Sequence, residues 1–89
     1  MVWIIKYTES ASKQLKKLDK QIALRILDYM DERIAGLSDP RSSGKSLKGP
    51  RMGEYWRYRV GDIRVICKIV DGQMTVLVIE IGNRREVYR

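Results

Sequence analysis

The stretch with the strongest structural signal is Tyr55-Trp56-Arg57-Tyr58-Arg59-Val60-Gly61-Asp62-Ile63-Arg64-Val65-Ile66-Cys67-Lys68-Ile69-Val70. It holds two runs rich in β-branched and aromatic residues on either side of Gly61-Asp62, a two-residue turn of the hairpin type. A second turn signal, Asp71-Gly72, precedes a third such run from Met74 to Ile81. The sequence therefore predicts a three-stranded antiparallel meander.

The residues before the meander predict one strand and two helices. Val2 to Tyr7 is β-branched and aromatic, and Thr8 is a suitable N-cap for the first helix. A longer helix follows, with apolar residues at helical spacing from Ile22 to Leu37. We expect the two helices to form a hairpin around Asp19-Lys20.

These elements predict an α+β fold of order β-α-α-β-β-β, in which a small antiparallel sheet packs against an N-terminal helical hairpin. Arg41 to Gly53 is polar and rich in glycine, so it predicts a loop with a short extended piece around Leu47. The pattern leaves open where the first strand enters the sheet. With 89 residues, the chain is expected to form one domain, residues 1–89.

Composition excludes several classes of site. The chain has no histidine, which excludes Ser-His and Cys-His nucleophile pairs. Cys67 is the only cysteine, so no internal disulfide forms, and its apolar surroundings predict a core residue. The apolar run at the N-terminus is too short for a signal peptide or a membrane span. We therefore expect a cytoplasmic protein without membrane contact.

The positive charge is concentrated in one part of the chain. Residues 41–68 carry eight basic and two acidic residues, a net charge of +6, whereas the whole chain carries +7. Residues 1–40 have seven bases and six acids, and residues 71–89 have three of each. A positive surface focused on a small sheet indicates an anionic partner, above all the phosphates of nucleic acid.

Strand alternation brings these bases together. Arg57 and Arg59 share one face of their strand, and Arg64 and Lys68 share one face of the next. If the hairpin aligns the two polar faces, the four side chains form a tight cationic surface. Basic residues on exposed strands also prevent aggregation, which is the alternative explanation. Arginine, however, forks two hydrogen bonds onto one phosphate, which favours a phosphate site.

The chemistry that fits such a surface needs no metal or other cofactor, and we predict none. Gly44-Lys45-Ser46 lacks the upstream glycine of a phosphate-binding loop, and the paired acids of a metal site are missing. In RNA, the ribose 2′-hydroxyl can attack its own adjacent phosphate, so a protein has only to orient the groups and stabilise the developing charge. No general base is evident in the sequence.

At this point the sequence resembles the RelE family of bacterial toxins, within the RelE/ParE superfamily. The resemblance covers nearly the whole chain. It rests on the order and spacing of three segments, Lys45 to Gly49, Trp56 to Val65 and Ile81 to Tyr88. It implies the same fold, a small sheet carrying a helical hairpin. It also implies a ribosome-dependent endoribonuclease that cuts mRNA and stops translation.

The resemblance also implies roles for individual residues. Arg57 and Arg59 stand where RelE toxins place basic catalytic side chains, and Arg64 and Arg84 match phosphate-stabilising arginines. Tyr88 matches the C-terminal aromatic residue of the family. The implied contacts to mRNA or ribosomal RNA come from Lys45, Lys48, Arg51, Lys68 and Arg85. Many relatives have histidine at the position of Asn83, so a histidine-based mechanism is excluded here.

The implied partners are a cognate antitoxin, the ribosome and mRNA, with operator DNA contacted only through the antitoxin complex. Two other functions remain open at this stage. One is a ParE-like toxin that poisons DNA gyrase without cutting RNA, and the other is a non-catalytic RNA-binding domain. The superfamily shares one fold, so fold alone does not choose among them.

Overall fold

The predicted hairpin forms with the expected bounds in the computed structural model, which describes residues 2–47 and 55–83. Strand β3 is Tyr55–Val60 and strand β4 is Ile63–Val70. They pair antiparallel across Gly61-Asp62, where Gly61 takes a left-handed conformation with φ 61°. A φ of this sign costs glycine nothing, which explains the glycine at this turn.

Strand β5, Thr75–Asn83, completes the meander, and its bounds differ from the predicted Met74 to Ile81. A 3-10 turn, Asp71–Gln73, replaces the expected two-residue turn, and Met74 closes it in a left-handed conformation with φ 47°. Met74 N donates a hydrogen bond to Asp71 O at 3.0 Å. Thr75 therefore becomes the first paired residue, opposite Val70.

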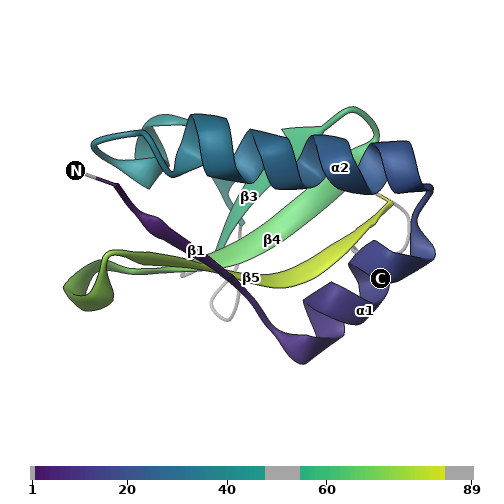
Figure 1. Cartoon of the computed structure of the whole chain (residues 1–89). Helices are drawn as coiled ribbons and strands as arrows, with labels where there is room; N and C mark the ends of the chain where they lie inside the picture. The colour runs from purple at the N-terminus through teal and green to yellow at the C-terminus, as the bar shows by residue number, and fades with distance from the viewer. Residues whose placement is uncertain (1, 48–54, 84–89) are drawn as a thin grey trace.

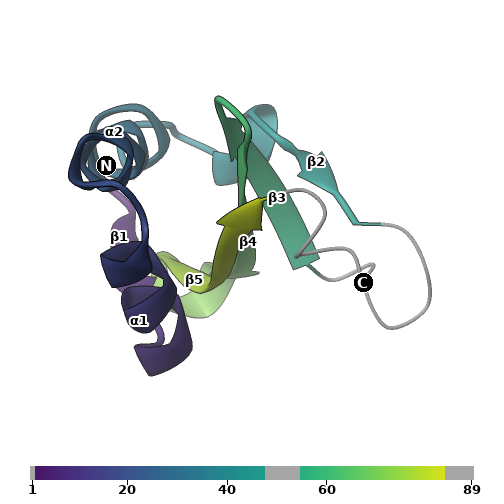
Figure 2. The same ribbon diagram turned by 90° about the vertical axis from the view of Figure 1, so that its right-hand side faces the viewer.

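The sheet has five strands in the order β1-β5-β4-β3-β2, and Figure 2 shows them side by side. Strand β1, Ile4–Tyr7, pairs parallel with β5 and forms one edge. Strand β2, Lys45–Ser46, pairs antiparallel with β3 and forms the other edge. The expected extended piece near Leu47 is thus a short strand. The sequence left open where the first strand enters the sheet, and the structure shows that it pairs with β5.

Helix α1, Glu9–Lys17, follows β1 directly and lies against β5 (Figure 1). Thr8 caps it as predicted, because Thr8 Oγ1 accepts a hydrogen bond from Ala11 N at 3.1 Å. The same hydroxyl donates to Ile79 O at 3.2 Å, and Gln14 Oε1 accepts from Ile81 N at 2.7 Å. The helix therefore covers the part of β5 that extends beyond its pairing with β1.

Helix α2, Lys20–Asp28, begins at its cap Asp19 and continues as a π-helical segment, Tyr29–Ile34. The predicted single helix from Ile22 to Leu37 is thus correct in place but differs in its bounds and in its last turns. Periodicity does not separate these helix types over so short a run, since apolar residues recur on one side in both. Figure 1 shows α2 lying across one face of the sheet.

The core lies between this helical layer and the sheet. Its fully buried side chains include Ile26 and Met30 from the helical layer and Tyr58, Val65 and Val78 from the strands. Cys67 is also fully buried, as expected, and burial raises the pKa of its thiol. The opposite side of the sheet, which carries Arg57, Arg59 and Arg64, is called the outer face below. Among the described residues, no helix is long and apolar enough to cross a membrane.

Candidate nucleic-acid interface

The outer face aligns the basic residues of β3 and β4, as the alternation predicted. Arg59 stands directly opposite Arg64, and Arg57 stands opposite Ile66. Directly opposed residues place their Cβ atoms about 4.5–5.5 Å apart and project to the same side. The sequence left the register of the hairpin open. The structure has the register that aligns the polar faces of β3 and β4.

The Arg59–Arg64 pair is an unusual arrangement for a sheet, since like charges in direct opposition destabilise strand pairing. Arg59 is exposed, whereas Arg64 has only 4% of its surface exposed. On its other side Arg64 stands opposite Gly82. Two guanidinium groups in one row, one of them largely out of water, suit an anion that both can contact.

The edge strand β2 adds a further base to this part of the face. Lys45 stands opposite Arg57, in the row next to the Arg59–Arg64 pair. Lys45 is exposed and Arg57 is half-buried. We call these four residues, Lys45, Arg57, Arg59 and Arg64, the arginine corner.

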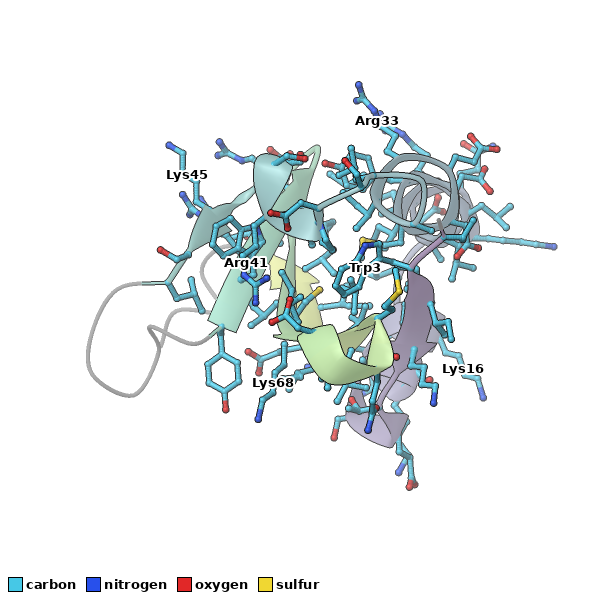
Figure 3. All side chains as sticks on the ribbon, turned by 90° about the vertical axis from the view of Figure 1, so that its left-hand side faces the viewer. Trp3, Lys16, Arg33, Arg41, Lys45 and Lys68 are labelled. Carbon is cyan, nitrogen blue, oxygen red and sulfur yellow. The ribbon has the colours of Figure 1, made fainter. Side chains whose placement is uncertain are left out.

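Lys68 shares the outer face and lies one row beyond Arg57, at the border of the arginine corner. It stands opposite Tyr55 on one side and Leu77 on the other, and Leu77 in turn stands opposite Lys6. Four residues along a strand span about 13 Å, so Lys68 lies two rows from Arg64, although the register makes it the diagonal neighbour of Arg57. The sequence missed Lys6, because the place of the first strand was open. We call Lys6 and Lys68 the lysine end; Figure 3 shows Lys68 far from Lys45.

One acid interrupts this basic face. Glu80 stands opposite Ile66, in the row between those of Arg64 and Lys68, and the described strands carry no other acid on this side. Asn83 instead stands opposite Ile63, so the register puts it on the core-side face. Asn83 thus lies across the sheet from the Arg59–Arg64 row.

Five predicted site residues lie outside the described residues: Lys48, Arg51, Arg84, Arg85 and Tyr88. Their position relative to the arginine corner stays a prediction. Over residues 2–47 and 55–83, no group of three or more His, Cys, Asp or Glu side chains could hold a metal ion.

Aromatic hydrogen-bond donors hold the segment that leads to Lys45, a feature that the sequence did not reveal. Tyr58 Oη donates to Pro40 O at 2.8 Å, and Trp56 Nε1 donates to Ser43 O at 2.6 Å. Both donors lie on β3 and both acceptors are main-chain carbonyls more than ten residues earlier. The carbonyls carry no sequence signal, so only the folded chain shows the contacts.

A bidentate ion pair ties the same segment to the far end of the meander. Arg41 Nη1 and Nη2 lie 2.9 Å from Asp71 Oδ1 and Oδ2, respectively. This hydrogen-bonded guanidinium lowers the pKa of the Asp71 carboxyl, and the carboxylate raises the pKa of Arg41. Arg41 is thereby engaged away from the outer face, although the sequence counts it among the eight clustered bases.

Comparison with known proteins gives a consistent result. A profile of the family described as the ParE toxin of the type II toxin–antitoxin system parDE matches residues 5–88. Toxin RelG of Mycobacterium tuberculosis is 27% identical over 90 residues, which cover 100% of this chain and 99% of that protein.

Solved structures show the same fold. The toxin–antitoxin complex RelBE2 of Mycobacterium tuberculosis contains a chain that superposes with a TM-score of 0.84 at 21% identity, covering 94% of this chain and 93% of that one. A mutant of the Escherichia coli toxin RelE in the free state superposes with a TM-score of 0.78 at 24% identity, covering 99% and 92%.

Proposed function

Because the chain belongs to the ParE toxin family of type II toxin–antitoxin systems, within the RelE/ParE superfamily, we propose that this toxin cuts mRNA on the ribosome. The observation that carries the proposal is the arginine corner. Arg59 and Arg64 stand in direct opposition, and Arg57 and Lys45 occupy the next row. Four cations gathered at one end of a sheet suit a single phosphate that gains negative charge during a reaction.

The proposed reaction uses the substrate's own nucleophile. The 2′-hydroxyl of RNA loses its proton as its oxygen forms a bond to the adjacent phosphorus. The bond from phosphorus to the 5′-oxygen of the next nucleotide breaks, and that oxygen takes up a proton, which leaves a 2′,3′-cyclic phosphate and a 5′-hydroxyl. The protein orients these groups and stabilises charge on the phosphorus oxygens, the role of the guanidinium groups. Arg57, Arg59 and Arg64 are the described members of the proposed catalytic set, which Arg84 and Tyr88 complete. Lys48, Arg51 and Arg85 are proposed to contact mRNA or ribosomal RNA.

We propose that a cognate antitoxin neutralises the toxin. Mycobacterium tuberculosis RelBE2, a structural neighbour, is a toxin–antitoxin complex, which supports a partner of this kind. Covering the outer face would keep RNA from the arginine corner. The proposed setting is the cytoplasm, where ribosomes, mRNA and the antitoxin are found, and operator DNA would be contacted only through the antitoxin.

A second candidate function is poisoning of DNA gyrase, and the family description favours it, since that family is named for ParE. A gyrase poison acts by binding and does not need cations that converge on one phosphate. The direct opposition of Arg59 and Arg64 therefore supports RNA cleavage over this alternative.

The test is to add the purified toxin to a translating extract and map the 5′ ends of the mRNA. Wild-type protein is expected to cut only at codons occupied by ribosomes. Arg59→Ala is expected to slow cutting by roughly 10²–10³-fold, because it removes one donor to the developing charge. Arg59 is exposed, so its loss should leave the melting temperature nearly unchanged.

The matched control is Arg25→Ala, which removes an exposed arginine from α2 and should cut like wild type. Intact mRNA together with broken DNA would identify a gyrase poison instead. Tight RNA binding without any cuts would identify a non-catalytic RNA-binding domain. Equal loss in both variants would mean that net charge, rather than the arginine corner, drives the activity.

A further inference from the structure

A groove of about 490 Å³ lies on the outer face between the sheet and α1. Tyr55 and Ile66 line it from β3 and β4, and Ile79 and Glu80 line it from β5. Thr8, Ser10 and Gln14 line it from the side of α1. Its size falls within the range of small-ligand sites, which combine apolar surface with placed polar groups.

The groove lies between two cationic places. Along β4 the side chains on the outer face are Arg64, Ile66 and Lys68, so Ile66 in the groove has a base two residues away on each side. Each step of two residues spans about 6.6 Å. A single strand of nucleic acid can therefore place one phosphate at the arginine corner and another at the lysine end, with the intervening base over the groove.

Tyr55 supplies the aromatic surface that such a base needs. It is half-buried, lines the groove and stands opposite Lys68. Proteins that bind single strands combine a basic groove with aromatic side chains on which bases stack. The charge at both ends and the aromatic wall between them favour a nucleobase as the occupant of this groove.

Glu80 is the one acidic side chain in the lining of the groove. An ionised carboxylate only accepts hydrogen bonds, and it would repel a nearby phosphate. Among the described residues, no ion pair involves Glu80, although Arg64 is its diagonal neighbour. A carboxylate in an RNA-binding face is therefore best matched by a base that presents adjacent N–H donors. The Watson–Crick edge of guanine presents two, N1–H and the N2 amino group, in the spacing of two carboxylate oxygens.

We propose that this groove is a nucleobase site in which Glu80 selects guanine next to the scissile phosphate. The inference rests on the proposed RNA cleavage, and it adds a residue that determines which sequences are cut. Glu80 is assigned base selection alone, and the phosphate chemistry stays with the arginine corner.

The test compares the cut sites of wild type and Glu80→Gln in the translating extract, by mapping 5′ ends at many codons. Wild type is expected to favour guanine at one fixed position beside the cut. Glu80→Gln should lower cutting at those sites about tenfold or more. It should also raise cutting where adenine replaces guanine, since the amide accepts from the adenine N6 amino group and donates to N1. The total number of cuts should fall less than the guanine preference.

The matched control is Glu32→Gln, an exposed acid in the π-helical segment, which should keep the wild-type preference. Unchanged base preference in Glu80→Gln, with wild type still cutting, overturns the nucleobase site but leaves the proposed function intact. If Glu80→Gln keeps the wild-type base preference but binds the antitoxin more weakly, the nucleobase site is also overturned, and the groove is a protein-docking site. If wild type cuts no RNA, the proposed function itself fails.

Discussion

Gly44 shows how one residue fixes the edge of the sheet. It has φ +76°, and a Cβ at this position would lie 2.7 Å from Trp56 Nε1 and closer still to Arg57 O. Gly44→Ala should therefore lower the free energy of unfolding by roughly 2–4 kcal/mol, from the left-handed conformation and the clash together. Urea unfolding followed by circular dichroism measures the change.

Two other glycines separate these contributions. Gly61 has φ +61°, and nothing lies within 4 Å of the position that a Cβ would take. Gly61→Ala should therefore lower the free energy of unfolding only through the left-handed backbone conformation, by about 1–2 kcal/mol. Gly72 has open space and no left-handed φ, so Gly72→Ala should change stability by less than about 1 kcal/mol. Equal losses at Gly44 and Gly61 would show that the close approach to β3 is unimportant.

At the scale of elements, the connection from the helices to β2 depends on Trp56. Trp56→Phe keeps an aromatic ring but removes the donor to Ser43 O, so it should destabilise the protein by about 1–3 kcal/mol. The loss should be local to β2. Amide exchange of Leu47 N–H, which donates to Tyr55 O at 3.1 Å, should become faster. Cutting of RNA should fall as well, because Lys45 loses its support opposite Arg57.

Trp3→Phe provides the comparison for this element. Trp3 Nε1 donates to Ser38 O at 3.3 Å, at the opposite end of the connection from Lys45. Trp3→Phe should also destabilise the whole protein. The amide exchange rate of Leu47 should then rise only as much as the loss of global stability accounts for. If both variants changed Leu47 exchange alike, the Trp56 hydrogen bond would have no special role in holding β2.

For the whole molecule, the core between helices and sheet sets the response to alkaline pH. Burial, followed by Asp31 and Cys67, raises the pKa of Tyr7 from 10.0 to about 12, and burial also raises the pKa of Tyr58. The folded state holds these protons more tightly than the unfolded state. The contribution of Tyr7 to stability is therefore complete below pH 10 and is lost as pH rises from 10 to 12.

Tyr7→Phe tests whether Tyr7 causes this loss of stability at alkaline pH. No described group hydrogen-bonds the buried Tyr7 hydroxyl, so its removal should leave neutral-pH stability unchanged or raise it by about 1 kcal/mol. Melting temperatures measured from pH 7 to 12 should then fall less steeply above pH 10 than in wild type. An identical alkaline slope in both proteins would mean that Tyr7 ionises freely in the folded state.

Local patterns in the sequence settled the hairpin and the sides to which its residues project. Strands β3 and β4 have the predicted bounds, and Arg57, Arg59 and Arg64 share the predicted face. Side-chain alternation and turn chemistry depend on neighbouring residues alone, so no distant contact is needed to read them. The caps at Thr8 and the buried Cys67 follow from equally local signals.

Contacts between distant segments settled the rest. The parallel pairing of β1 with β5 brings Lys6 beside Leu77, and the aromatic donors of β3 bring Lys45 beside Arg57. The same register sets Lys68 two rows from Arg64 and places Glu80 in the row between them. These positions depend on which strands become neighbours and on packing against α1 and α2. Which strands pair depends on the free energy of the whole chain, so no single segment of the sequence reveals it.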